Sequence, residues 1–197
     1  MSLIARSSKS SSTADHPAAG THMARLVGIT DLGHQPGFTY EGKEIESTFK
    51  MEFTYELVNS LMADGRPHWV SEQFKNNDFV PDKPGGFIAT MMARVAAMTP
   101  ETPTETDVSK LIGKPCMVTV SINSGGYPKV AGQGAVTGIP VGMDIPALQN
   151  ETFLFDMDEP DMDLWETFPE FKQNRIKEAL NFEETELFKQ IALQGEL

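Results

Sequence analysis

A mainly β fold is predicted for this 197-residue chain: a five-stranded barrel with one short helix between its third and fourth strands, followed by an acidic helical extension. Three observations lead to this prediction. Apolar and polar side chains alternate along residues 47–58, residues 87–98 have the Ala- and Met-rich composition of a helix, and carboxylates concentrate after residue 150. A chain of this length suffices for one full core with appendages.

The first three strands follow from alternation and from turn residues. Residues 17–33 alternate after an opening turn, and Gly28 within them predicts a bulge or a sharp bend. Residues 33–44 are rich in Gly and Pro and are predicted as a loop. In residues 47–58 five apolar side chains share one face, and 68–74 follows an Asp-Gly turn as the hairpin partner. That apolar face consists of Phe49, Met51, Phe53, Tyr55 and Leu57.

The helix and two further strands complete the predicted barrel. Residues 76–86 are predicted as a loop and 87–98 as a short helix, because this segment contains neither Gly nor Pro. Residues 115–123 predict a strand, and 129–141 predict a final strand interrupted by glycines. Five strands with a helix between the third and the fourth have the layout of an OB-fold, a partly open Greek-key barrel. The pattern alone is also compatible with other small barrels.

Composition divides the chain into three parts. Residues 1–16 are a Ser-rich tail that we expect to be disordered, residues 17–148 the barrel, and residues 149–197 the acidic extension. Within the extension, apolar spacing and a proline near the start predict one helix over 170–181 and a second over 183–194.

Charge is distributed unevenly along the chain. The net charge is −12, and residues 151–197 carry 13 acidic against four basic side chains, whereas the other 150 residues carry 15 against 12. The overall charge argues against nucleic acid as a partner, since phosphate contacts need Lys and Arg. The near balance in the rest of the chain still allows a local basic face.

Motifs that carry chemistry are missing from the sequence. The single cysteine, Cys116, excludes an internal disulfide and a Cys-based zinc site, and its apolar surroundings are typical of a buried, inert thiol. The four histidines are scattered, and neither a P-loop nor a Gly-x-Ser-x-Gly elbow occurs. We therefore expect no enzymatic activity, no cofactor and no metal. There is no apolar run of about 18 residues, so we expect no membrane span and a cytoplasmic location.

Several stretches, taken in order, resemble one protein family. They are GTHMARLVGITDLGHQ (20–35), KMEFTYEL followed by DGRPHWVSEQF, LIGKPCMVTVSI followed by YPKVAGQGAV, and the acidic LFDMDEPDMDLWETFPEFKQNRIKEALNF. Their order and spacing are similar to those of OB-fold single-stranded DNA-binding proteins of tailed phages, over roughly residues 18–182. The resemblance implies binding of single-stranded DNA without sequence preference, during phage replication or recombination in the host cytoplasm.

A site of this kind needs aromatic rings that stack on bases and cations that follow the phosphates. Trp69, at the end of a hairpin, is either a core residue or a stacking platform. Phe74 and Lys75 are either an aromatic–cation pair for one nucleotide or a solvated strand end, and Arg25 could contact phosphate or pair with a glutamate. The predicted DNA-binding residues are Arg25, Tyr40, Lys43, Lys50, Arg66, Trp69, Phe74, Lys75, Tyr127 and Lys129.

The acidic segment has two interpretations that do not exclude each other. As a flexible arm it would compete with DNA for the groove, or recruit basic faces of replication or recombination proteins through aromatic anchors. Alternatively, its aromatic residues pack a C-terminal helix on the barrel and its carboxylates stay solvated. The predicted partner-binding residues are Asp158, Asp161, Asp163, Trp165, Phe168 and Phe171.

The rival function is that of a protein-interaction adaptor: an OB-like barrel within a replication or recombination complex, with little affinity for DNA. The sequence leaves the oligomeric state open, and a homo-oligomer is compatible with it.

Overall fold

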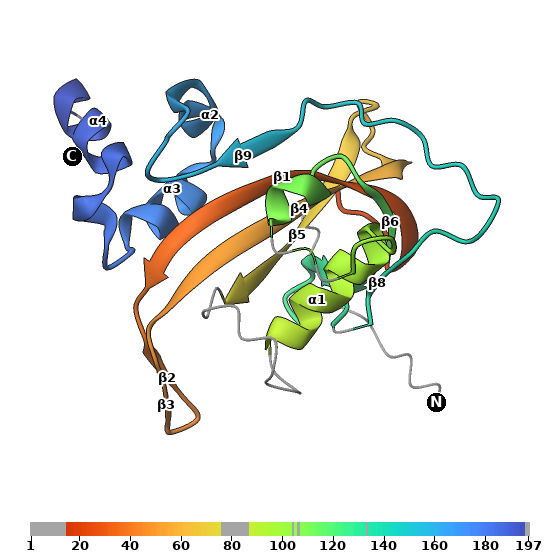
Figure 1. Cartoon of the computed structure of the whole chain (residues 1–197), viewed down its shortest axis with the longest axis horizontal. Coiled ribbons are helices and arrows are strands. Elements are labelled where there is room, and N and C mark those ends of the chain that lie inside the picture. The colour runs from red at the N-terminus through yellow and green to blue at the C-terminus, as the bar shows by residue number, and fades with distance from the viewer. Residues whose placement is uncertain (1–14, 76–86, 104, 106, 133, 196–197) are drawn as a thin grey trace, which may run out of the picture.

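The computed structural model describes residues 15–75, 87–103, 105, 107–132 and 134–195. Of the predicted tail only residues 15 and 16 fall within these ranges, and the predicted loop 76–86 lies outside them (Figure 1). The strands are β1 (Gly20–Gln35), β2 (Phe38–Tyr40), β3 (Lys43–Ile45), β4 (Thr48–Leu61), β5 (Pro67–Lys75), β6 (Pro115–Ile122), β7 (Pro128–Val130), β8 (Val136–Thr137) and β9 (Phe153–Phe155). The helices are α1 (Phe87–Met98), η1 (Val108–Leu111), α2 (Met162–Thr167), α3 (Glu170–Lys177), η2 (Phe182–Glu184) and α4 (Glu186–Gln194).

The main sheet confirms that the protein is mainly β. Its strands follow the order β5-β4-β1-β6-β7 with antiparallel pairing throughout, while β8 pairs with β6 and β9 pairs with β1. The two end strands of this order, β5 and β7, contact each other, but within the described ranges no hydrogen-bonded ladder joins them. The sheet therefore curves on itself without being closed by backbone hydrogen bonds.

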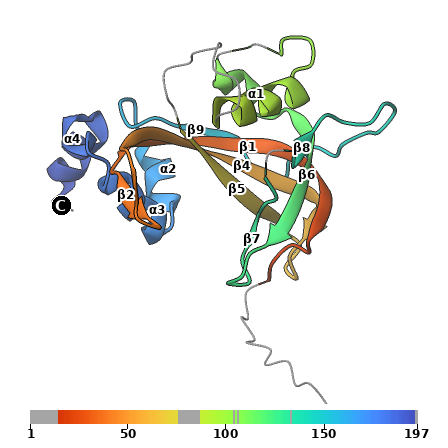
Figure 2. The same cartoon turned by 90° about the horizontal axis from the view of Figure 1, so that it is seen from below.

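Helix α1 occupies the predicted place and has the predicted bounds, between the third and fourth long strands of the chain. It covers one side of the curved sheet (Figure 2), and together they enclose a core of aliphatic, Met and aromatic side chains. On β4 the predicted apolar face is confirmed for Phe53, Tyr55 and Leu57, which are fully buried. Phe49 departs from the prediction, because it lies exposed near the start of β4, stacked on His34 at a centroid distance of 4.7 Å.

Strand β1 bends at Gly28, as predicted. The register against β4 shifts between Leu26 and Gly28, and from Gly28 onward β1 pairs in parallel with β9 rather than with β6. The ring of Phe153 lies directly over Gly28, and a Cβ at this position would overlap it. Glycine is therefore needed here for close packing, and the bend lets one strand serve two parts of the molecule.

The C-terminal unit, which we define as β9 and α2–α4 (residues 153–194), has a core of its own beside one end of the sheet (Figure 1). Strand β1 extends into it, so that the unit and the sheet are packed together. No helix in the described part of the chain has the length and apolar character needed to cross a membrane. The buried residues of this second core are Leu32, Phe155, Met157, Trp165, Phe168, Ile176, Ala179, Phe182, Leu187 and Ile191.

Helix boundaries in the C-terminal unit differ from the prediction. Helix α3 ends at Lys177 instead of residue 181, because the next residues bond to β1: the Leu180 amide donates to the His34 carbonyl, and the Asn181 side chain accepts from the His34 amide, each at 2.7 Å. Helix α4 begins at Glu186, where the Thr185 hydroxyl caps it. Helix α2 and strand β9 are short and were not predicted.

Two β segments also differ from the prediction. Part of the predicted loop 33–44 forms the β2–β3 hairpin, which projects from the sheet (Figure 1). Its turn residues Glu41 and Gly42 have φ values of 49° and 75°, as a two-residue hairpin turn of type I′ requires. The predicted final strand 129–141 is divided into β7 and β8 by an intervening turn.

Candidate nucleic-acid interface

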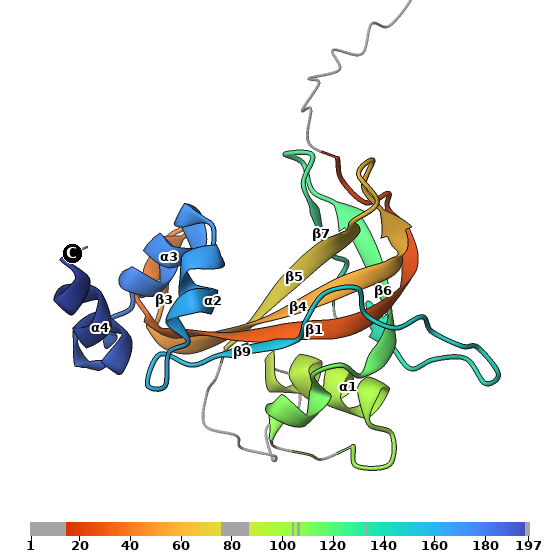
Figure 3. The same cartoon turned by 90° about the horizontal axis from the view of Figure 1, so that it is seen from above.

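A groove of about 750 Å³ lies between the outer face of β4–β5 and the C-terminal unit; Figure 3 shows the elements that bound it. We call it the β4–β5 groove. The sheet lines it with Glu52, Thr54, Trp69 and Ser71, and the opposite wall includes Phe153, Phe168, Phe171 and Lys172.

The outer face of β4–β5 changes character along its length. Because side chains alternate across a strand, the residues that do not enter the core face outward and pair directly across the two strands. Trp69 lies toward one end of this face and two lysines lie at the other. Hydroxyl, amide and carboxylate side chains lie between these ends or opposite Trp69, and those of Glu52, Thr54 and Glu56 on β4 are buried. The outward pairs are Glu56 with Trp69, Thr54 with Ser71, Glu52 with Gln73, and Lys50 with Lys75.

Trp69 is 42% exposed at the edge of the groove. Its indole packs against the Phe153 ring at a centroid distance of 6.1 Å, and Phe153 in turn contacts Phe168 at 6.3 Å. Trp69 is thus supported on one side by a ladder of rings and open on the other, the arrangement a stacking platform needs. Of its two predicted alternatives, the exposed position is the observed one.

A second hollow, of about 340 Å³, lies on the other side of Trp69 and has Arg66 and Pro128 in its lining. Tyr127 lies in the β6–β7 turn and is 60% exposed. Its ring makes an edge contact with the His16 ring at a centroid distance of 5.9 Å. Lys129 is exposed on β7. Trp69 lines both hollows, and the second hollow reaches the Tyr127–Lys129 pair through Pro128 and His16, although some 60 residues separate the pair from Trp69 in the sequence.

On the groove wall that residues 150–172 provide, acidic side chains outnumber basic ones. Glu151, Asp161 and Asp163 line this wall and are exposed. Lys172 is the basic residue there, and its Nζ lies 2.6 Å from Glu52 Oε1, with both side chains about 12% exposed or less. This ion pair joins α3 to β4 and neutralises Lys172, so that the remaining charged residues in the lining of the groove are carboxylates.

Three predicted DNA-binding residues are engaged within the protein. Arg25 donates from Nε to the Pro146 carbonyl at 2.7 Å, and from its two terminal nitrogens to the carbonyls of Gly113 and Ile145 at 2.9 Å each. This guanidinium holds two loops against β1 rather than facing phosphate. Phe74 is 1% exposed in the sheet core, so the prediction that it stacks on a base is corrected: its position on β5 points inward. Arg66 is exposed but paired with Asp64 at 2.7 Å.

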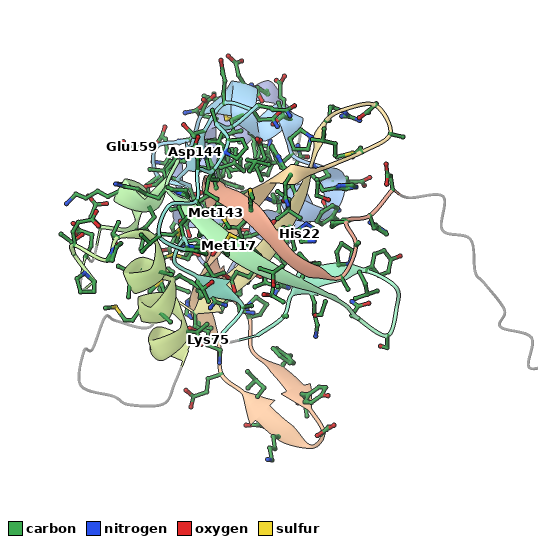
Figure 4. All side chains as sticks on the ribbon, turned by 90° about the vertical axis from the view of Figure 1, so that its right-hand side faces the viewer. His22, Lys75, Met117, Met143, Asp144 and Glu159 are labelled. Atoms are coloured by element: carbon green, nitrogen blue, oxygen red, sulfur yellow. The ribbon has the colours of Figure 1, made fainter. Side chains whose placement is uncertain are left out.

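The remaining predicted residues lie around the β2–β3 hairpin. Tyr40 and Lys43 are cross-strand partners at its tip and are exposed there. Lys50 and Lys75 pair near its root and are half-buried. Figure 4 shows Lys75 beside the root of the projecting hairpin.

Predicted partner-binding residues divide into buried and exposed sets. Trp165 is 3% exposed and Phe168 is also buried, so the prediction that they anchor a partner is corrected: both belong to the core of the C-terminal unit. Phe171 is 74% exposed and lines the groove. The carboxylates Asp158, Asp161 and Asp163 are exposed, and Asp161 caps α2 by accepting from the Leu164 amide.

Two contributors to this surface were not predicted from the sequence. Phe153 supports Trp69, and the β-branched or aromatic character of residues 152–155 was a weak strand signal. Arg175 on α3 lies close enough to Lys50 to affect its titration. Partial burial, with the charges of Arg175 and Lys75, lowers the pKa of Lys50 below its ordinary value.

No model of a known protein family matches the chain, and a search of curated proteins gives no match either. The described residues contain no cluster of three or more His, Cys, Asp or Glu side chains placed to hold a metal ion.

Proposed function

We propose that this protein binds single-stranded DNA without sequence preference, on the outer face of β4–β5, and that its curved sheet is an OB-type barrel. The order of the five strands and the place of α1 agree with OB topology, in which β4 and β5 correspond to the second and third strands. That face, with the loops between strands one and two and between strands four and five, is where OB-folds bind oligonucleotides. Here those loops are the β2–β3 hairpin and the β6–β7 turn.

The observation that carries the proposal is the exposed indole of Trp69 at the junction of two hollows. A base stacked on it would have the next ring, Tyr127, beyond one hollow and the β4–β5 groove on the other side. Stacking uses the face that all bases share, so binding of this kind does not depend on sequence. Lys129, two residues after Tyr127, is an exposed cation at that end.

The role that follows is coating of unpaired DNA, which protects it and removes hairpins without any chemical step. The resemblance to phage single-stranded DNA-binding proteins supports replication or recombination of phage DNA in the host cytoplasm as the setting. No observation on the molecule itself favours DNA over RNA, because stacking does not involve the sugar.

Titration with oligo-dT tests the proposal through the two tryptophans. We expect quenching of Trp69 emission, and persistence of emission from the buried Trp165. W69A is expected to weaken binding about 5- to 150-fold, which corresponds to about 1–3 kcal/mol for one stacked base. W69F should abolish the quenching signal while retaining most of the affinity, because a ring stays in place.

The matched control is L193A, which removes an exposed apolar side chain on α4, outside the groove. It should bind oligo-dT like the wild type. K129Q should reduce the slope of log K against log salt by about 0.7, the value for one phosphate contact on a single strand. Equal binding by the wild type and W69A would contradict the proposed site.

A second function, that of a protein-interaction adaptor, is favoured by one observation: the excess of carboxylates in the lining of the groove, together with exposed Phe171. Such a surface suits a basic partner segment with an apolar anchor. An adaptor would give neither quenching by oligo-dT nor an affinity that depends on salt, so the same titration separates the two functions.

A further inference from the structure

Two lysines face each other directly at the root of the β2–β3 hairpin. Lys50 and Lys75 are cross-strand partners in the β4–β5 ladder, and both are half-buried. Like charges placed directly opposite each other destabilise a sheet. Within the described ranges, no carboxylate lies within salt-bridge distance of either ammonium group, in contrast to Lys110, Lys172 and Lys189, which are all paired.

The pair lines a hollow of about 310 Å³ that is separate from the β4–β5 groove. Gln73 lines this hollow, and its amide also donates to Glu52 Oε2 at 3.3 Å. Phe38 contributes a half-exposed ring, while Glu46 is the carboxylate on the wall. An amide donor, two ammonium groups and a nearby aromatic ring are the groups that a phosphate and its attached base would contact.

The C-terminal unit adds a third positive charge. The Gln35 side chain donates to the Arg175 carbonyl at 3.0 Å, and Gln35 is the cross-strand partner of Thr48, two residues before Lys50. Among the described residues, the ion pair that the Arg175 guanidinium makes is a long one, of 3.4 Å to Glu178, which follows α3 directly. Partial burial, with the charges of Arg175 and Lys75, lowers the pKa of Lys50, so its charged form is disfavoured in the absence of an anion.

We propose that this hollow is a binding site for a phosphate-class anion held by Lys50 and Lys75, with Arg175 of the C-terminal unit, which does not line the hollow, as a nearby third positive charge. The identity of the anion rests on the proposed function: it is the phosphate backbone of single-stranded DNA where the strand leaves the β4–β5 face. The C-terminal unit, despite its net negative charge, would then supply part of the DNA site instead of competing with it.

The experiment measures two ligands on the same variants by calorimetry at low salt: inorganic tripolyphosphate and oligo-dT. The variants are K75Q and R175Q, with K189Q as the matched control. K189Q makes the same change of charge on α4, where Lys189 pairs with Glu186 on the surface. We expect K75Q to weaken both ligands about fivefold and R175Q about twofold, in line with exposed or half-exposed ion pairs, and K189Q to leave both unchanged.

Measuring both ligands distinguishes failure of the anion site from failure of the DNA-binding function. Binding of tripolyphosphate that depends on Lys75 and Arg175, without binding of oligo-dT, would uphold the anion site and reject the DNA-binding function. Binding of oligo-dT that is equal in R175Q, K75Q and K189Q would uphold the function and overturn the proposal that this hollow holds the DNA backbone. Absence of tripolyphosphate binding to the wild type would also overturn it.

Discussion

The sheet core and the core of the C-terminal unit are built differently, although both lie against β1. The sheet core is mostly aliphatic and encloses an ionic network, in which Arg94 is fully buried and its guanidinium contacts both oxygens of Glu72 at 2.9 Å. The C-terminal core is smaller and depends on large rings, with Phe155 stacked on Trp165 at a centroid distance of 5.8 Å. Charge lies inside the first core and around the second.

The difference shows that an acidic composition does not prevent a segment from building a core. In the C-terminal unit the carboxylates lie at caps and on the surface, as Asp161 does at the start of α2. The apolar side chains between them are rings, each of which buries a large area, so few residues suffice. A charge-rich segment therefore folds here because its aromatic residues, rather than its average hydrophobicity, supply the buried surface.

The two cores meet at a small number of contacts. Strand β1 contributes Ile29 to the sheet core and Leu32 to the C-terminal core. Phe153 lies on Gly28, and the Lys172–Glu52 ion pair joins α3 to β4. Each core also contains a natural probe, since Cys116 is buried in one and Trp165 in the other.

Removal of the buried guanidinium should have the largest effect. R94A leaves the Glu72 carboxylate without its partner next to the Tyr55 hydroxyl, which donates to it at 2.7 Å. We expect a loss of about 3–5 kcal/mol in the free energy of unfolding, the range for breaking a buried ion pair from one side. Urea unfolding followed by circular dichroism measures it.

The control R66A makes the same substitution at an exposed ion pair, and its unfolding midpoint should match that of the wild type. Cys116 gives a local readout, because burial raises the pKa of its thiol to about 12 and the native protein should resist Ellman's reagent. R94A should shorten this protection. Equal midpoints for R94A and R66A would show that the network does not stabilise the sheet core.

A substitution at the junction should affect the two cores unequally. In G28A the new methyl group overlaps the Phe153 ring, and we expect a loss of about 1–3 kcal/mol from overpacking. Because Phe153 belongs to the C-terminal unit, Trp165 emission in a W69F background should change at lower urea than Cys116 becomes reactive. The control G134A places a methyl group where nothing lies within 4 Å. Coincident loss of both probes in G28A would show that the cores unfold as one.

The smallest effect concerns a carboxylate between the two regions. Burial, with the nearby charges of Asp156 and Asp158, raises the pKa of Asp31 above its ordinary value of 3.8. The folded state therefore binds this proton more tightly than the unfolded state, and stability is lost as pH rises from about 3.8 through the raised pKa. D31N keeps an oxygen for the Gly33 amide and removes the charge.

We therefore expect D31N to melt above the wild type at pH 7 and to lose this advantage as the pH falls to the ordinary carboxyl range. Thermal melts at pH 7 and pH 4 measure the difference. D144N, which changes an exposed loop aspartate, is the control and should show no gain that depends on pH. A constant gain of D31N at both pH values would exclude the charge as its cause.

Elements with a strong local signal were predictable, and those that depend on partners were not. The ten-residue alternation before Val58 and the composition around Met91 place β4 and α1, because period and propensity are properties of the segment itself. Strand β9 has three residues and exists because β1 continues past β6 and offers it an edge. The end of α3 is likewise fixed by hydrogen bonds to His34.

The candidate site divides in the same way. Residue types suited to stacking and to phosphate, such as Trp69 and Tyr127, stand out in the sequence because few side chains have that chemistry. Whether such a residue is exposed cannot be predicted from the sequence, since Phe74 and Trp165 have the same chemistry and are buried. Arg175 was assigned to an acidic segment by its position in the chain, and only the fold places it near Lys50.

The sequence by itself determined the alternating strands, the helix between them and the segregation of charge, since each is encoded in neighbouring residues. The tertiary structure decided which rings face solvent, how the acidic segment packs on β1, and which cations share one hollow. These features depend on contacts between residues far apart in the chain, and the free energies of such contacts cannot be predicted from neighbouring residues alone.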